Sequence, residues 1–247
     1  MNSNPYIAAI ITASAAFVAA VAAQMLSHWL TKKRENHKYN KEVYQKLYAP
    51  ILFELYVFFD VRTAFRRAHD IKGDVDVNEI KSKIVKHIAA NQMYSSPRII
   101  SALHRVRHFD YHEDLQVGNL QNIAEIELLW CMLDQLVNLN ETTNLFDREN
   151  KDILMKYSFH YILWTIISIL RGEDAYEILS YKHSLNIDTA IEKFYKGLKK
   201  DFKRYRLGQQ DKQFLKQSLE EVISRLTNGS GEFSPHGKTY LERSKNT

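Results

Sequence analysis

The chain has 247 residues, of which 12% are aromatic, and a formal net charge of +5 at pH 7. Its 8 Gly and 4 Pro argue against a sheet-rich fold with many tight turns, and its single cysteine excludes an intrachain disulfide. The basic excess suits proximity to anionic lipid headgroups and is too small by itself to indicate nucleic acid as a partner. We expect an all-α protein with a core rich in aromatic side chains.

Residues 6–30 contain no Asp, Glu, Lys or Arg. As a helix rising about 1.5 Å per residue, this stretch covers about 37 Å, enough for a hydrocarbon core of about 30 Å. Tyr6 and Trp29 lie where interfacial aromatic residues are expected. A cleaved signal peptide is the alternative, but there the positive charge precedes the apolar region. We therefore predict that residues 1–30 form a short outside tail and a single transmembrane anchor.

Positive charge follows the anchor at once, in Lys32, Lys33 and Arg34. Residues 1–4 carry no side-chain charge, so the positive-inside rule places the amino terminus outside and the remaining chain in the cytoplasm. The three basic residues are expected to contact anionic headgroups of the cell membrane. The predicted topology is single-pass, with a cytoplasmic helical domain.

The predicted anchor is rich in alanine and carries two stripes of small residues at a spacing of four. Small residues allow helix backbones to approach closely in lipid, so the stripes favour homo-oligomerisation through the anchor. The alternative is a span that inserts without associating. The stripes consist of Ala8, Thr12, Ala16 and Ala20, and of Ala15, Ala19, Ala23 and Ser27.

A basic juxtamembrane helix is predicted over residues 31–50, where Pro50 interrupts the pattern. A cytoplasmic bundle of about seven helices is predicted over residues 51–228, beginning with a central, largely buried helix. Asp76 or Asn78 can cap the next helix, and Ser96 followed by Pro97 marks another that runs to about Asp110.

Later in the chain, an amphipathic helix is predicted after Gly118, with an apolar stripe and a break at 144–147. Residues 157–170 form an apolar run of 14 residues, which is too short to span a bilayer and predicts a buried core helix. Two amphipathic helices are predicted over 188–206 and 211–227, and residues 229–247 are predicted to be disordered. The apolar stripe of the helix after Gly118 comprises Leu120, Ile123, Leu129, Leu133 and Leu136.

Three histidines, His104, His108 and His112, recur every four residues on or just past the Pro97 helix. Imidazoles at this spacing share a helix face and are weak candidates for metal ligands. The HEXXH pattern is missing, and this face lies opposite the apolar stripe. A solvated polar face is the favoured interpretation, and we predict no cofactor.

Arg98 and His104 are separated by five residues, and this spacing resembles the R-x(4–6)-H motif of the HEPN ribonuclease superfamily. The resemblance covers two residues, and Ile99 replaces the polar residue that often follows the arginine. It implies an all-helical fold in which the arginine and the histidine act on RNA, usually across a dimer. Arg98 and His104 are therefore weak catalytic candidates.

The helix predicted over 188–206 has a basic face opposite its aromatic and aliphatic stripe. The functional interpretation is contact with anionic lipid or, less favoured, with nucleic acid phosphates, and the alternative is a solvated face. Its members are Lys193, Lys196, Lys199, Lys200, Lys203, Arg204 and Arg206.

The sequence contains no phosphate-binding glycine loop, Gly-x-Ser-x-Gly elbow, Cys-x-x-Cys pair or EF-hand loop. Common ATPases, hydrolases, zinc ribbons and calcium sensors are therefore disfavoured, and an enzyme is less favoured than a binding protein. The leading hypothesis is a membrane-anchored scaffold, adaptor or oligomeric effector of a bacterium or phage. The alternatives are a membrane-tethered HEPN-like ribonuclease and a toxin-like effector that damages membranes.

Overall fold

The computed structural model describes residues 5–64, 66–111, 117–172, 175–180 and 191–228. Regular secondary structure in these segments is helical, and none of them contains a strand. The all-α prediction is therefore confirmed. The chain divides into two compact units, residues 1–42 and 43–247, each of which is described by itself.

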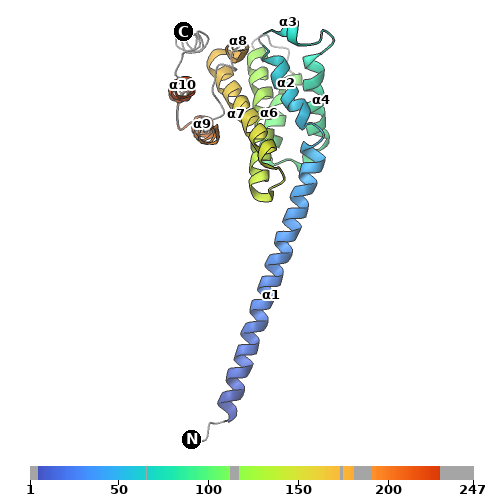
Figure 1. Ribbon diagram of the computed structural model, residues 1–247, viewed down its shortest axis with the longest axis vertical. Helices are drawn as coiled ribbons and strands as arrows, with labels where there is room; N and C mark the ends of the chain where they lie inside the picture. Colours follow the sequence, from blue (N-terminus) through green and yellow to red (C-terminus); the bar gives the residue numbers. More distant parts are fainter. Residues whose placement is uncertain (1–4, 65, 112–116, 173–174, 181–190, 229–247) are drawn as a thin grey trace. The chain divides into compact units, whose positions relative to one another are not determined.

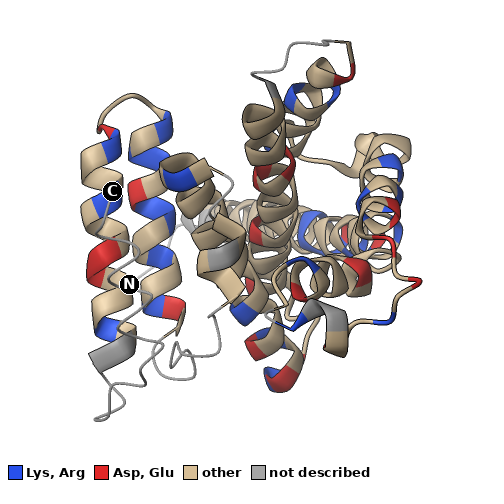
Figure 2. Ribbon diagram, turned by 90° about the horizontal axis from the view of Figure 1, so that it is seen from above, with Lys and Arg blue, Asp and Glu red and all other residues tan. Residues whose placement is uncertain are grey.

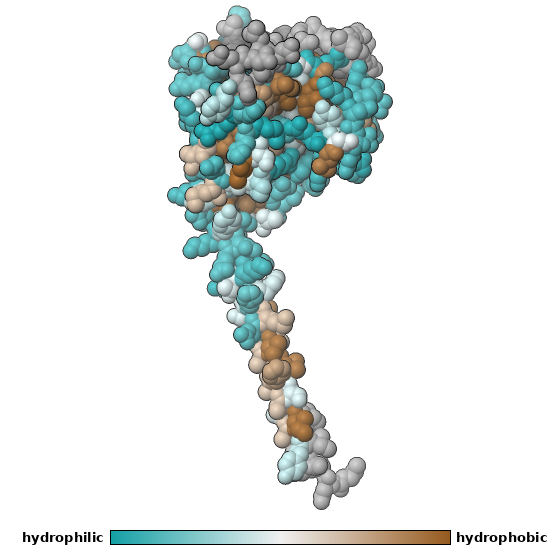
Figure 3. Space-filling view, turned by 180° about the vertical axis from the view of Figure 1, so that it is seen from behind, coloured by the Kyte–Doolittle hydropathy of each residue, from teal (hydrophilic) through white to brown (hydrophobic). Residues whose placement is uncertain are grey.

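The first unit consists of helix α1 (Pro5–Val43), which continues without a break past its apolar segment (Figure 1). Apolar residues occupy the earlier part of α1, and hydrophilic residues cover its later part (Figure 3). The helix continues through the charged residues after Leu30, as the juxtamembrane prediction required. Its apolar segment is not buried against other parts of the protein that the structure describes.

The second unit opens with a π-helical turn, Tyr44–Tyr48, and helix α2 (Leu52–Arg62). Helix α2 was predicted to be largely buried. Its side chains at Leu55, Phe58, Phe59 and Val61 are buried, whereas Phe53 is 74% exposed. A short α3 (Arg67–Asp70) precedes α4 (Val77–Ala90). The carboxylate of Asp76 caps α4 by accepting the backbone N–H groups of its first turn, at 2.8 and 3.4 Å.

Helix α5 (Pro97–His108) begins where the Ser-Pro pair predicted it. The hydroxyl of Ser96 accepts the backbone N–H of Ile99 at 3.5 Å, and Pro97 occupies the first turn, where its missing N–H costs nothing. Short 3₁₀ turns, Gln92–Tyr94 and Phe109–Tyr111, flank the helix. Its apolar stripe, with Ile99, Leu103 and Val106, is buried.

The centre of the second unit is formed by α6 (Val117–Thr143) and α7 (Arg148–Arg171), which pack along each other. The amphipathic prediction for α6 was wrong in its first turns, because Leu120 is 58% exposed. It also missed that every residue from 124 to 134 is buried, including three carboxylates. Helix α5 covers another side of α6, which explains the burial around its whole circumference.

The apolar run in α7 is a core helix, as predicted. Residues 158–168 are all buried, and the hydroxyl groups of Ser158, Tyr161 and Thr165 have backbone acceptors within the protein. Ser158 and Thr165 donate to carbonyls one turn earlier, at 2.7 and 2.8 Å, and Tyr161 donates to the carbonyl of Leu55 at 2.7 Å. These hydrogen bonds allow the helix to carry the three hydroxyl groups inside the core.

Helix α8 (Ala175–Ser180) is followed by α9 (Ile191–Arg206) and α10 (Lys212–Asn228), which pack against each other (Figure 2). Asp211 caps α10, accepting the N–H of Phe214 at 2.9 Å. Helix α9 in turn packs on α7. The predicted start of the α9 helix at 188–190 and the predicted disordered tail at 229–247 lie outside the described residues.

Candidate functional site

The apolar segment of α1 is the first candidate. None of the described side chains in its charge-free stretch is buried, and Lys33 lies over the ring of Trp29 at 5.3 Å, where the apolar segment ends. The basic residues Lys32 and Arg34 are exposed. Both small-residue stripes lie on this exposed helix, although the side chain of Ala8 lies outside the described residues. The helix is long and apolar enough to cross a membrane.

The histidine ladder is only partly described. His104 and His108 are exposed on α5 and line one pocket with Leu120 and Ile123, whereas His112 lies outside the described residues. Within the described segments, no group of three or more His, Cys, Asp or Glu is placed to hold a metal ion.

The two residues of the HEPN-like spacing, Arg98 and His104, line different pockets. Their side chains start from α5 about 120° apart around the helix axis, because six residues correspond to about 600° of rotation. The guanidinium of Arg98 pairs with Asp134 at 2.6 Å and lies over the ring of Trp130 at 4.4 Å. These contacts give Arg98 a place in the packing of α5 on α6.

Two carboxylates inside α6 organise a basic cleft between α5, α6 and α9. Asp134, with a side chain only 2% exposed, accepts from Arg98, from Lys199 at 2.6 Å and from the hydroxyl of Tyr195 at 2.5 Å. Burial and the neighbouring Asp134 carboxylate raise the pKa of Tyr195. A buried carboxylate is costly unless it is paired and hydrogen-bonded, and Asp134 meets both conditions.

The second buried carboxylate, Glu127, lies seven residues earlier on the same face of α6. It pairs with Arg105 at 3.1 Å and accepts the Nε–H of Arg206 at 3.1 Å, while Arg206 also contacts its other oxygen. The cleft around both carboxylates has a volume of about 620 Å³. Four cations therefore surround two carboxylates, and the cleft keeps a positive surplus.

The predicted basic face of α9 is divided by these contacts. Lys199 and Arg206 point to the carboxylates of α6, and Lys196 pairs with Glu192 at 2.6 Å. Lys203 lines the cleft. The remaining members of the predicted face, Lys193, Lys200 and Arg204, are exposed.

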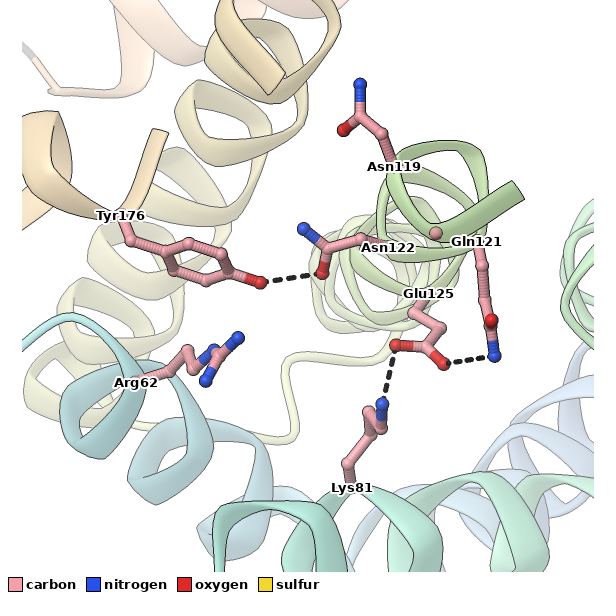
Figure 4. A pocket seen from close by; sticks show the side chains of 8 residues that line it. Arg62, Lys81, Asn119, Gln121, Asn122, Glu125 and Tyr176 are labelled. Atoms are coloured by element: carbon pink, nitrogen blue, oxygen red, sulfur yellow. Dashed lines mark hydrogen bonds and ion pairs between the residues drawn. The ribbon is translucent and has the colours of Figure 1, made fainter. Parts of the chain in front are cut away.

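A second polar pocket, of about 520 Å³, lies between α2, α4, α6 and α8 (Figure 4). Arg62 lies over the ring of Tyr176 at 4.1 Å, and the Tyr176 hydroxyl donates to the side-chain oxygen of Asn122 at 2.7 Å. On the other side, Lys81 pairs with Glu125 at 2.8 Å. None of these residues was a predicted site residue.

Cys131 is buried in α6, and burial raises the pKa of its thiol to about 12. The thiolate is the reactive form of cysteine, so this side chain is unreactive near neutral pH.

Comparison with protein-family models, with curated proteins and with solved structures gave no match for this chain.

The carboxylates of α6 had a signal in the sequence that the analysis missed. Glu127 and Asp134 interrupt an apolar run and are spaced seven apart, which places them on one helix face. Charges embedded in this way need cationic partners, and α9 supplied the densest run of lysine and arginine. Arg62 had no comparable signal, because its neighbours in the pocket come from four separate helices.

Proposed function

We propose that this chain is a single-pass membrane protein whose helical second unit works in the cytoplasm through protein interaction or oligomerisation. In this proposal, residues 6–30 cross the bilayer with the amino terminus outside. The basic residues that follow them remain at the cytoplasmic surface, where they contact anionic headgroups.

The observation that carries the proposal is the exposed apolar segment of α1. Phe17, Val18 and Met25 are each at least 65% exposed, and no Asp, Glu, Lys or Arg interrupts the stretch. A continuous apolar surface of this kind requires a cover of lipid or protein, because exposure to water costs about 25 cal/mol per Å². Its length matches a bilayer, which favours lipid.

Oligomerisation is supported by the positions of the small residues on α1. Residues 12, 15, 16, 19, 20 and 23 fall within one arc of the helix, and all are exposed. Such an arc permits two helices to approach closely, and van der Waals packing then favours their association in lipid.

Orientation can be tested by labelling single cysteines with a membrane-impermeant maleimide in intact cells. Because Cys131 is buried, it contributes little background, and a Cys131→Ala chain removes that background entirely. We expect Ser3→Cys to label in intact cells and Lys38→Cys to label only after permeabilisation. Labelling in the reverse order, or extraction of the unmodified chain by alkaline carbonate, would contradict the proposal.

Association through α1 can be tested by chemical cross-linking in membranes. Replacing Ala16 and Ala20 together by leucine should reduce cross-linked dimers several-fold, because the larger side chains keep the helices apart. Val21→Leu is the matched control, since residue 21 lies on the opposite side of the helix. Equal cross-linking of the wild type and both variants would argue against association through this face.

A further inference from the structure

The pocket beneath Tyr176 contains Arg62, which pairs with no carboxylate among the residues that the structure describes. Arg98, Arg105, Arg206 and Arg225 each pair with a carboxylate. By contrast, the contact of the Arg62 guanidinium within the described residues is the face of the Tyr176 ring. Stacking on that face leaves the five N–H donors at the edge of the guanidinium directed away from the ring.

The Tyr176 ring that supports Arg62 is itself held on two sides. Its hydroxyl donates to Asn122, and its ring packs against Trp164 with centroids 5.6 Å apart and the planes at 74°. Figure 4 shows Arg62 and Lys81 pointing into the same space from α2 and α4, with Asn122 and Glu125 facing them from α6. The cationic groups are therefore positioned by the fold.

The pocket has more hydrogen-bond donors than acceptors. Glu125 is the one carboxylate among the described lining residues, and it accepts from Lys81 at 2.8 Å through one oxygen and from Gln121 at 3.4 Å through the other. Lys81 keeps two further N–H donors, and the Asn122 amide keeps its NH₂ group because its oxygen accepts from Tyr176. A ligand that complements these groups carries several acceptor oxygens.

The charges around the pocket also favour an anion. Arg62 and Lys81 outweigh Glu125, and the amino-terminal turn of α6, which contains Gly118, borders the pocket and has no acidic residue. The amino terminus of a helix carries partial positive charge and favours an anion. The pocket volume of about 520 Å³ lies within the range for small-molecule sites, which is about 300–1,000 Å³.

We propose that this pocket binds a small organic anion through a carboxylate or a phosphate monoester. Arg62 holds the oxyanion through paired N–H groups, Lys81 adds a second positive charge, and the Asn122 amide donates to a neighbouring oxygen. The inference does not depend on the orientation of α1. The oxyanion belongs either to a free metabolite or to a lipid headgroup.

The test is a titration of the full-length protein in phosphatidylcholine nanodiscs, at constant ionic strength, with inorganic phosphate and separately with malonate. Calorimetry should show saturable binding of at least one probe to the wild type, with a Kd of about 1 mM. Arg62→Gln should weaken that binding at least tenfold. Lys203→Ala is the matched control, because Lys203 lines the other basic cleft, and its affinity should equal that of the wild type.

Arg62→Lys provides a second variant that keeps the charge, and circular dichroism checks that each variant folds. Lysine lacks the planar guanidinium with its paired N–H donors, so Arg62→Lys should weaken binding about threefold or more. This variant therefore tests the proposal if Arg62→Gln does not fold. Absence of saturable binding for both probes, or wild-type affinity in the folded Arg62 variants, would overturn the proposal.

A second arm uses nanodiscs that also contain phosphatidic acid. If the wild type binds phosphate or malonate more weakly in these nanodiscs, and the Arg62 variants show no such change, a lipid headgroup occupies the same pocket. Unchanged affinity indicates a free metabolite. Both results support an anion site at Arg62, and they identify the source of the anion.

Discussion

Helices α1 and α7 are both long and apolar enough to cross a membrane, but their surroundings differ. None of the apolar segment of α1 is buried, whereas 72% of the corresponding segment of α7 is buried within the protein. Helix α7 is aromatic, and Trp164 stacks on Phe58 with centroids 5.8 Å apart. The apolar segment of α1 is rich in alanine, whose small side chain offers little surface to a protein core. The two helices therefore share a high hydropathy, and the size of their side chains distinguishes the core helix α7 from the exposed helix α1.

The largest expected effect is on α7. Replacing Ile166, which is fully buried, by arginine places an unpaired charge in the core, at a cost of several kcal/mol. A typical domain has about 5–15 kcal/mol of stability, so we expect the second unit to lose its cooperative unfolding transition. Circular dichroism during thermal unfolding measures the change.

The control for this prediction is the same substitution on the same helix at Ile153, which is 37% exposed. Ile153→Arg should leave the unfolding transition nearly unchanged, because its charge can reach water. A normal transition for Ile166→Arg would mean that α7 is not a core helix.

The opposite pattern is expected for α1. Val18 lies at the middle of the charge-free segment and is 65% exposed, so Val18→Arg should leave the second unit folded. Arginine at the centre of a transmembrane helix costs about 2.5–3.5 kcal/mol of insertion free energy. We therefore expect a clear shift of the chain from the membrane pellet to the soluble fraction after carbonate extraction. Val18→Leu should remain in the pellet, and equal retention of the arginine variant would argue against a bilayer span.

Alkaline pH should destabilise the second unit and leave membrane retention of α1 unaffected. Burial raises the pKa of the Cys131 thiol to about 12, so this thiol ionises more readily in the unfolded chain than in the folded one. Burial also raises the pKa of Tyr48 and Tyr161, with the same sign. Stability is thus complete below the pKa of the unfolded thiol, near 9, and is lost as pH rises from there toward about 12.

For Cys131 alone, the expected slope is about 1.4 kcal/mol of unfolding free energy per pH unit in that window. Urea unfolding of the wild type and of Cys131→Ala at pH 8 and pH 10 measures it, and the alanine variant should show the shallower decline. Identical declines in the two proteins would exclude Cys131 as a source of the pH dependence.

Much of the fold was predictable because it depends on local patterns. The Ser96-Pro97 start, the Asp76 cap and the 14-residue core run each follow from the preferences of a few adjacent residues. The burial of α6 was not predictable in this way. Whether Leu120 or Asp134 faces solvent depends on which helices pack around α6, and the tertiary arrangement determines that.

The sites were less predictable than the fold. The sequence singled out Arg98 and the basic face of α9, but it could not show that Arg98 and Lys199 converge on one carboxylate, 36 and 65 residues away in the chain. The pocket of Arg62 combines residues from four helices, so no local spacing indicates it. The candidate site is therefore a product of packing.

The smallest expected effect concerns how α7 begins. Helices of a folded core start at a cap, and the Asp147 carboxylate accepts the backbone N–H of Asn150 at 2.9 Å in the first turn of α7. Asp147→Ala should lower the free energy of unfolding by about 1 kcal/mol, because one N–H of the first turn then lacks its acceptor. Asp152→Ala removes an exposed carboxylate from the same helix without removing the cap, so its urea midpoint should stay near that of the wild type. Equal midpoints for both variants would mean that packing of α7 alone fixes its first turn.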